Sequence, residues 1–230
     1  RTLLMNLQTL QWDEELCKIL TVPMTLLPEI KPSIGVFGYT QRSGWGNKIP
    51  VSGVAGDQQS ALFGQACFSP GEAKCTYGTG SFLLMNAGSK IPKTKSGCLT
   101  TVAWSWGKKV TYALEGSAFI CGAAVQWLRD GLKIISKSSD IEPLALTVED
   151  NGGVQFVPAL TGLGAPHWKP EARGVICGLT RGSTAGHLAR ATLEGMALQN
   201  AELLLSMQKD VKKKLKILKA SIHPEPAWYP

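Results

Sequence analysis

The sequence predicts a globular protein that mixes α-helices with β-strands, in the α/β or α+β class. Its 230 residues can bury a sizeable core, as one large domain or as parts of two. Hydrophobic residues make up 44% of the chain and charged residues 18%, a composition that excludes a disordered or fibrous protein. The 25 glycines indicate many turns, and the segments between them have helix-like or strand-like apolar spacing.

The N-terminal segment predicts a short helix followed by a loop. Residues 7–22 place apolar side chains near the helical period, among acidic positions. Pro23 and Pro28 end this pattern, because proline lacks the backbone donor that a helix needs. Further along, residues 42–47 predict a turn.

A strand that leads to an acidic residue comes next. Residues 49–55 are mostly apolar and predict a short strand that runs directly into Gly56 and Asp57. Residues 58–67 have helical composition. The predicted order is therefore strand, glycine, aspartate and helix, followed by a junction at 68–72.

Two β-hairpins are predicted after this junction. Each consists of two apolar runs separated by a short segment that suits a turn. The first pairs residues 73–77 with 81–86 across Gly78-Thr79-Gly80, and the second pairs 100–104 with 110–114.

The next part of the chain predicts a helix and two strands around a loop. Residues 118–135 carry apolar side chains at helical spacing behind Ser117, a residue type that suits the helix N-cap. Strands are expected at 154–158 and 174–179. They flank a loop rich in glycine and proline, in which His167 has no carboxylate partner close by in the sequence.

A last long helix is predicted from Ser183 or Thr184, either of which can cap it, to about Leu215. The net charge of +7 would suit an anionic partner, and lysines gather towards the end of this helix. These are Lys209, Lys212, Lys213, Lys214, Lys216 and Lys219. We interpret them as a solvated basic face at the negative end of the helix dipole, and we expect no nucleic-acid partner.

The cysteines and the apolar pattern bear on the cellular compartment. The six cysteines are scattered, without a CxxC pair or histidines at metal-ligand spacing, so they predict reduced core thiols and no metal site. No stretch approaches the roughly 18 apolar residues of a membrane span, and the N-terminal residues lack a signal-peptide pattern. We therefore expect a cytoplasmic protein.

Asp57 is the most informative side chain. Open α/β sheets commonly bind ligands at the carboxyl ends of their strands, and a carboxylate there can accept a hydroxyl proton. Taken alone, however, Asp57 is better explained as the cap of a helix that begins at Gln58.

A second candidate site is the triplet Gly78-Thr79-Gly80, where glycine would let backbone N–H groups approach phosphate oxygens. Taken alone, so short a motif is better explained as a tight hairpin turn. Similarly, Gly122 and Gln126, one helical turn apart, would by themselves predict a packing glycine and a surface glutamine.

Taken together, these motifs favour functional roles for Asp57, Thr79, Gly122 and Gln126. The runs GVAGDQQSALFGQ at 53–65 and TYGTGSFLLMN at 76–86 resemble the FGGY family of carbohydrate kinases almost residue for residue, in the same order and spacing. The likeness continues through 115–118, 126–130, 158–166 and 178–194, and so covers nearly the whole chain. Tyr77, Phe82 and the Leu-Met-Asn run are similar to the members that phosphorylate glycerol.

On the substrate side, the resemblance implies that Asp57 is the base that takes a proton from a glycerol hydroxyl. Gln58 matches a neighbour that contacts the substrate, and Phe82 matches a wall of the glycerol pocket. The implied reaction is the ATP-dependent phosphorylation of glycerol to glycerol 3-phosphate, in which positioning and charge stabilisation supply most of the catalysis.

On the nucleotide side, the resemblance implies that Thr79, Gly122 and Gln126 contact ATP or ADP, with Mg²⁺ bound to the nucleotide. The implied fold is ribonuclease-H-like, also called actin-like, with two α/β domains that close on a cleft. Residues 1–67 would be the C-terminal part of the first domain and residues 68–220 the N-terminal part of the second.

The ends of the chain depart from the family pattern. The family's N-terminal phosphate loop and its Asp-Gly-Gly-Ala nucleotide loop are missing, and residues 221–230 predict an atypical, disordered tail. We expect the 230 residues by themselves to be inactive, and a homo-oligomer is possible. A kinase for another polyol or a pentose, and a non-catalytic nucleotide-binding fragment, remain as alternatives.

Overall fold

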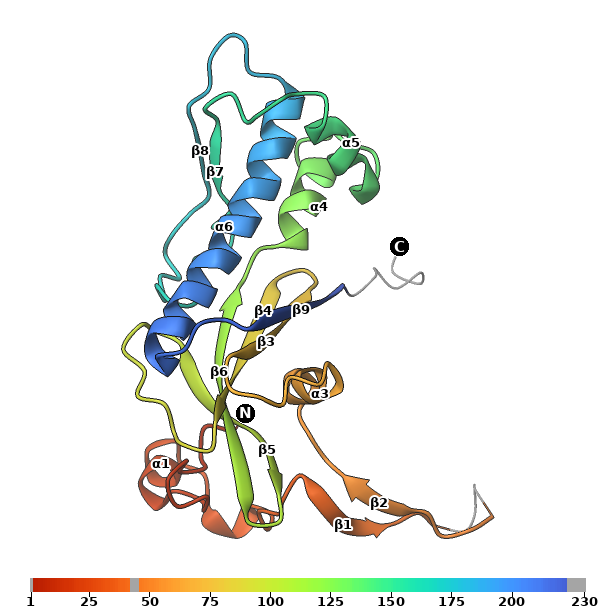
Figure 1. Cartoon of the computed structure of the whole chain (residues 1–230), viewed down its shortest axis with the longest axis vertical. Helices are drawn as coiled ribbons and strands as arrows, with labels where there is room; N and C mark the ends of the chain where they lie inside the picture. The colour runs from red at the N-terminus through yellow and green to blue at the C-terminus, as the bar shows by residue number, and fades with distance from the viewer. Residues whose placement is uncertain (1, 42–45, 223–230) are drawn as a thin grey trace.

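The computed structural model describes residues 2–41 and 46–222, which form a seven-stranded mixed sheet, a two-stranded sheet and the helices that pack on them (Figure 1). The strand order in the large sheet is β2-β1-β5-β6-β4-β3-β9. Its strands are β1 (Ile34–Tyr39), β2 (Pro50–Gly53), β3 (Glu72–Tyr77), β4 (Ser81–Gly88), β5 (Leu99–Trp106), β6 (Lys109–Ala118) and β9 (Ile217–Ile222). The small sheet pairs β7 (Gln155–Val157) with β8 (Val175–Cys177) in antiparallel register.

The α-helices differ greatly in length. They are α1 (Glu14–Ile19), α3 (Asp57–Gly64), α4 (Gly122–Asp130), α5 (Ile141–Ala145) and α6 (Ala185–Val211), and two short 3-10 helices are η1 (Met24–Leu26) and η2 (Ser138–Asp140). In Figure 1 the hairpin of β1 and β2 extends away from the rest of the molecule, while α4, α5 and α6 gather at the opposite end.

Both predicted hairpins are confirmed. Strands β3 and β4 pair antiparallel across the glycine-rich turn, and β5 pairs antiparallel with β6. Pairing of β4 with β6 then joins the two hairpins into one continuous sheet. Strands β5 and β6 are longer than predicted, because cross-strand hydrogen bonds continue beyond the apolar runs.

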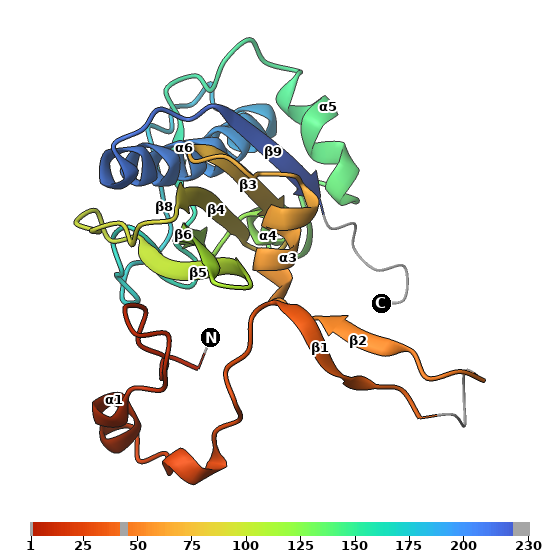
Figure 2. The same ribbon diagram turned by 60° about the horizontal axis from the view of Figure 1, so that its bottom comes forward.

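The two faces of the central strands pack against different helices (Figures 1 and 2). Side chains in a strand alternate between faces, so neighbouring residues of β4 enter different cores. Leu83 and Met85 belong to the cluster that includes Leu203 of α6. Leu84 belongs to the cluster that includes Leu62 of α3. The sheet is therefore covered by α6 on one face and by α3 on the other.

The N-terminal helix is shorter than predicted for residues 7–22. The Asp13 carboxylate accepts a hydrogen bond from the Leu16 N–H at 3.0 Å, which makes Asp13 the N-cap of α1. Before it, the Leu10 N–H donates to the Asn6 carbonyl at 2.8 Å in a turn. This local capping confines the helix to the second half of the predicted segment.

The segment before Asp57 also differs from the prediction. Residues 42–45 of the predicted turn lie outside the described residues. Strand β2 ends at Gly53, so residues 54–56 separate it from Asp57 and the strand does not run directly into the aspartate.

The helix predicted at 118–135 begins later and ends earlier. Strand β6 continues to Ala118, because Ser117 and Ala118 pair with the first residues of β4. Helix α4 therefore begins at Gly122 with Cys121 as its N-cap, so the prediction of Ser117 as the cap is wrong.

The C-terminal helix begins as predicted, with Thr184 as the N-cap of α6. It ends at Val211, where Lys212 takes a left-handed conformation with φ of 54°. The chain then returns as β9, which runs parallel to β3 and pairs with it as far as Ile222. The prediction of a disordered tail is therefore wrong for Ser221 and Ile222, while 223–230 lie outside the described residues.

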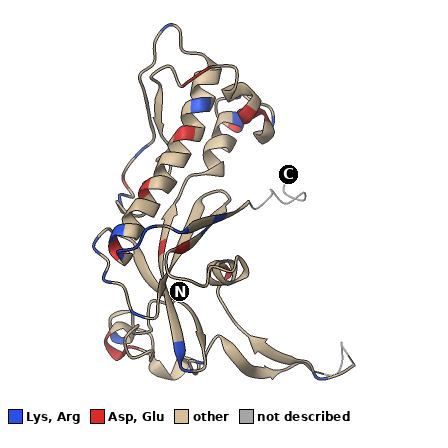
Figure 3. Ribbon diagram, viewed as in Figure 1, with Lys and Arg blue, Asp and Glu red and all other residues tan. Residues whose placement is uncertain are grey.

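The lysine-rich segment is mostly solvated, as predicted. Figure 3 shows basic residues at the end of α6, in the loop after it and along β9. Five of the six lysines are exposed, and Lys219 is the exception. Lys216 and Lys219 lie beyond the helix, and the Lys219 ammonium donates to the carbonyl oxygens of Gln65 and Ala66 at the C-terminal end of α3.

Most cysteines are buried free thiols. Cys17, Cys67, Cys75, Cys98 and Cys121 are buried, whereas Cys177 is exposed and is not the core thiol that was predicted. Burial raises the pKa of Cys75, Cys98 and Cys121 to about 11, which keeps these thiols protonated at neutral pH. Within 2–41 and 46–222, no helix is long and apolar enough to cross a bilayer.

Candidate active site

Asp57 is the first residue of α3, and its side chain is exposed. The N-cap of this helix is Gly56, not Asp57, so the carboxylate lies in the first turn, where the helix dipole favours negative charge. The Gln58 side chain donates from Nε2 to Asp57 Oδ2 at 3.0 Å. The carboxylate is thus oriented by its neighbour and remains accessible to a substrate.

A buried lysine lies beside this pair. Lys74 of β3 has no exposed surface, and its ammonium donates to Gln58 Oε1 and, at 3.0 Å, to Thr76 Oγ1. Sequence reasoning missed Lys74, although a lysine within the apolar run at 73–77 is a signal of a buried polar role.

Phe82 lies on the same face of the sheet as these groups. It is directly opposite Thr76 in the register of β3 and β4, and directly opposite residues share one face. Phe82 is 39% exposed, so it can contact a ligand. Asp57, Gln58 and Phe82, the three residues predicted on the substrate side, therefore lie on the same side of the sheet.

Thr79 and Gly122 form a second group. The Gly122 N–H donates to the Gly78 carbonyl at 2.9 Å, and the Cys121 N–H donates to the Thr79 carbonyl at 2.8 Å. A β-carbon on Gly122 would lie 2.6 Å from the Gly78 oxygen, so only glycine allows this approach. The turn between β3 and β4 is therefore locked onto the start of α4, with the Thr79 side chain exposed.

Gln126 follows Gly122 by one helical turn on the same face of α4 and is half-buried. The three residues predicted on the nucleotide side thus share one region at the end of the β3–β4 hairpin. The same hairpin carries Phe82 and Lys74, so it connects the two groups.

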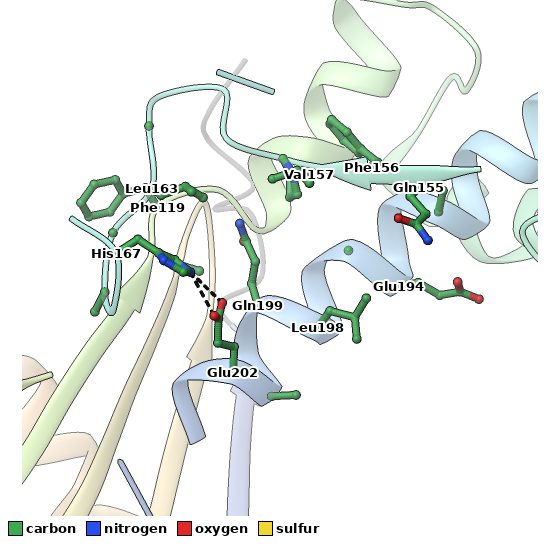
Figure 4. Close-up of a pocket in the computed structure, with 18 of the residues that line it drawn as sticks. Phe119, Gln155, Phe156, Val157, Leu163, His167, Glu194, Leu198, Gln199 and Glu202 are labelled. Carbon is green, nitrogen blue, oxygen red and sulfur yellow. Dashed lines mark hydrogen bonds and ion pairs between the residues drawn. The ribbon is translucent and has the colours of Figure 1, made fainter. Parts of the chain in front are cut away.

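A cavity of the described chain lies elsewhere. It has a volume of about 570 Å³ and is enclosed by α6, β7 and the loop before His167 (Figure 4). His167 Nε2 lies 3.0 Å from Glu202, so this histidine has the carboxylate partner that its sequence neighbours lack. None of the six predicted site residues lines this cavity.

Comparison with known families decides the class of protein. Residues 1–64 match the N-terminal domain of the FGGY family of carbohydrate kinases, and residues 73–221 match the C-terminal domain of the same family. The chain belongs to the FGGY family of carbohydrate kinases. The predicted domain boundary at 67/68 falls in the interval between the two FGGY matches and stays a prediction.

Curated relatives within the FGGY family are highly similar. The chain is 63% identical over 218 residues to a protein named glycerol kinase from Bdellovibrio bacteriovorus, covering 94% of this chain and 44% of the relative. It is 57% identical over 223 residues to a glycerol kinase from Myxococcus xanthus, covering 96% of this chain and 45% of the relative. The chain therefore spans less than half the length of the curated relatives it matches.

A solved FGGY structure confirms the predicted ribonuclease-H-like, actin-like α/β fold. A glycerol kinase from Plasmodium falciparum, determined with ADP, has a TM-score of 0.88 and 42% identity over 96% of this chain and 45% of that one. A xylulose kinase from Lactobacillus acidophilus has a TM-score of 0.79 at 24% identity, over 95% of this chain and 45% of that one, which shows the shared fold alone.

Proposed function

We propose that the protein to which this chain belongs transfers the γ-phosphoryl group of ATP to a terminal hydroxyl of glycerol, giving glycerol 3-phosphate and ADP. The observation that carries the proposal is the 63% identity over 218 residues to a relative named glycerol kinase. The exposed Asp57 carboxylate, on the same face as Phe82, supports it with a suitable site.

Asp57 would act as the general base. Its carboxylate would take the proton from the attacking hydroxyl as the oxygen–phosphorus bond forms and the bond to the β–γ bridging oxygen breaks. ADP would leave with the electron pair of that bond. Gln58, which donates to Asp57 Oδ2, would hold the carboxylate towards the glycerol, and the Phe82 ring would pack against the carbon chain of the substrate.

The nucleotide would lie beside the β3–β4 turn. The exposed Thr79 side chain and the face of α4 that carries Gly122 and Gln126 would contact it. ATP would enter as its magnesium complex, since Mg²⁺ binds phosphate oxygens with few protein carboxylates. Asp57 would offer one such carboxylate oxygen. In the described ranges, no three or more His, Cys, Asp or Glu side chains are grouped as potential ligands of a metal ion.

The organisation of the protein is proposed from three observations. The two FGGY matches favour a first domain that ends near residue 67 and a second that begins at 68. Five buried free thiols favour the reducing cytoplasm. Among the described residues β2 is the edge strand of the large sheet, and such an edge would suit a homo-oligomer.

Glycerol is the favoured acceptor over a pentose or another polyol. Relatives at 56–63% identity are named glycerol kinase, whereas the xylulose kinase structures are 13–24% identical to this chain. An acceptor panel of glycerol, xylulose and gluconate, assayed on the full-length protein by coupled ADP release, tests this choice. Turnover of xylulose or gluconate in preference to glycerol would refute it.

The role of Asp57 is tested by Asp57→Asn in the same protein. We expect kcat to fall by about 10²- to 10⁴-fold, the range for loss of a general base, with little change in ATP affinity. Asp13→Asn is the matched control, because Asp13 also lies at a helix N-terminus and asparagine caps as well as aspartate. Equal turnover in both variants would assign Asp57 to helix stabilisation.

A further inference from the structure

Lys74 occupies a position that packing and helix electrostatics both oppose. Its side chain has no exposed surface, and an ammonium withdrawn from water costs several kcal/mol unless polar groups surround it. It also lies at the N-terminal end of α3, where the helix dipole disfavours a cation. An apolar residue could fill this strand position without any polar partner, so the role of the ammonium is to be sought in the groups that it contacts.

The partners of Lys74 lead directly to the proposed base. The ammonium donates to Gln58 Oε1, and Gln58 Nε2 donates to Asp57 Oδ2 at 3.0 Å. Thr76 Oγ1 accepts a second bond from the ammonium at 3.0 Å and lies 3.3 Å from Ser221 Oγ of β9. A continuous series of hydrogen bonds thus connects two strands of the sheet to the Asp57 carboxylate.

The donors and acceptors of these groups determine which side of the Gln58 amide faces Lys74 and which side faces Asp57. An ammonium has donors only, so the side of the Gln58 amide that faces Lys74 must be its oxygen. The NH₂ group of the same amide is then the side that faces Asp57. Without the ammonium, the amide could turn over and present its oxygen to the carboxylate, which would repel it.

We propose that Lys74 is a positioning residue of the phosphoryl-transfer site, which orients the Gln58 amide and through it the Asp57 carboxylate. The proposal rests on the function proposed above, because it assigns Asp57 to the reaction. Loss of the ammonium would leave Asp57 in place but without its fixed direction, and misplacement of a reacting group by about 1 Å can reduce turnover by about 10²-fold.

The chain offers a matched control on the neighbouring strand. Lys219 of β9 is directly opposite Lys74 in the parallel register, and its ammonium bonds to the other end of α3. If Lys74 serves only to hold α3 on the sheet, Lys74→Met and Lys219→Met should affect the enzyme alike.

The experiment measures kcat and the Michaelis constants of the full-length protein carrying these variants. We expect Lys74→Met to lower kcat by about 10- to 100-fold with the Michaelis constant for ATP unchanged, while Lys219→Met retains kcat within about twofold. A loss of kcat in Lys74→Met no greater than in Lys219→Met would overturn the proposal.

A variant of Gln58 separates positioning from folding. Gln58→Glu keeps an oxygen for Lys74 but removes the donor to Asp57, so we expect a fall in kcat like that of Lys74→Met. The double variant should be no slower than the worse single one, because both act through the same series. Additive losses, or Gln58→Glu with the kcat of the parent, would refute the proposal even if Lys74→Met does not fold.

The acceptor panel keeps this inference distinct from the proposed function. If the parent phosphorylates xylulose or gluconate and not glycerol, the proposed substrate is wrong, and the variants are compared on the acceptor that is used. A parent that is active on glycerol, with no specific loss in Lys74→Met, refutes only the positioning role. A parent inactive on every acceptor refutes both.

Discussion

Replacing Gly122 by alanine should loosen the contact between α4 and the β3–β4 turn. The added β-carbon would lie 2.6 Å from the Gly78 carbonyl oxygen, so the two segments must separate by about 0.8 Å to reach the 3.4 Å of an ordinary contact. Both atoms are tied to backbone, because Gly122 begins α4 and Gly78 follows β3. Rotation of a side chain therefore cannot relieve the clash.

The loss of stability in Gly122→Ala follows from the hydrogen bonds between α4 and the β3–β4 turn. The N–H groups of Cys121, Gly122 and Ala123 donate to carbonyls of the turn at 2.8, 2.9 and 3.0 Å. Each such bond contributes about 0.5–1.5 kcal/mol net, whereas alanine gains about 1 kcal/mol over glycine inside a helix. Losing two or three of these bonds costs about 1–4.5 kcal/mol, so after the gain from alanine the net loss in the free energy of unfolding is at most about 3.5 kcal/mol.

Urea unfolding and steady-state kinetics on the full-length protein measure the two consequences. We expect Gly122→Ala to lose this stability and to raise the Michaelis constant for ATP about tenfold, with that for glycerol unchanged. Gly64→Ala is the matched control, since Gly64 ends α3 and a β-carbon there meets nothing within 4 Å. A Gly122→Ala variant with the stability and ATP kinetics of Gly64→Ala would refute the reasoning.

Three further outcomes are expected. Thr79→Val should raise the Michaelis constant for ATP about tenfold but not that for glycerol, because the exposed hydroxyl is lost; a change confined to the melting temperature would assign Thr79 to the turn alone. Burial raises the pKa of the Cys75 and Cys121 thiols from 9.0 to about 11, so stability is fully present below pH 9 and is lost as the pH rises towards 11. Urea titrations should show that the free energy of unfolding falls by up to about 3 kcal/mol per thiol over this pH range, and that this fall is absent when the cysteine is replaced by alanine. A free energy of unfolding in the parent that does not change with pH would contradict this. A polypeptide of residues 1–230 alone should release no ADP when glycerol is added, and it should self-associate through the edge strand β2. If it does release ADP, and Asp57→Asn abolishes that release, then the part of the protein that only the longer relatives contain is dispensable.

Local sequence signals sufficed where the structure is local. The two hairpins follow from apolar runs around short turns, and the start of α6 follows from Thr184 as its N-cap. Local capping by Asp13 shortened the first helix, and two other errors fall where a distant strand decides the conformation. Residues 117–118 stay extended because they pair with β4, and 217–222 form β9 because they pair with β3, about 145 residues earlier in the chain.

The candidate site could be predicted only in part for the same reason. Asp57, Thr79, Gly122 and Gln126 each had a common structural explanation, and only the joint resemblance to the family singled out Gln58 and Phe82 and favoured a functional role for all six. Gln58 and Lys74 are 16 residues apart in the sequence, so their hydrogen bond had no direct sign there. The bond forms because α3 packs on the strand that carries Lys74. A lysine inside an apolar strand was the one local signal that pointed to this contact.

The hydrogen bonds at the start of α4 limit which of its groups can bind a nucleotide phosphate. A phosphate at a helix N-terminus normally accepts from the free N–H groups of the first turn. Here the N–H groups of residues 121–124 already donate, the first three to the carbonyls of Gly78 and Thr79 and the fourth to that of Cys121. The turn thus occupies the place that a phosphate would take. We therefore expect the nucleotide contact to come from the Thr79 hydroxyl and the exposed face of α4, which is why Thr79→Val should alter ATP kinetics even though every backbone bond at this helix start remains intact.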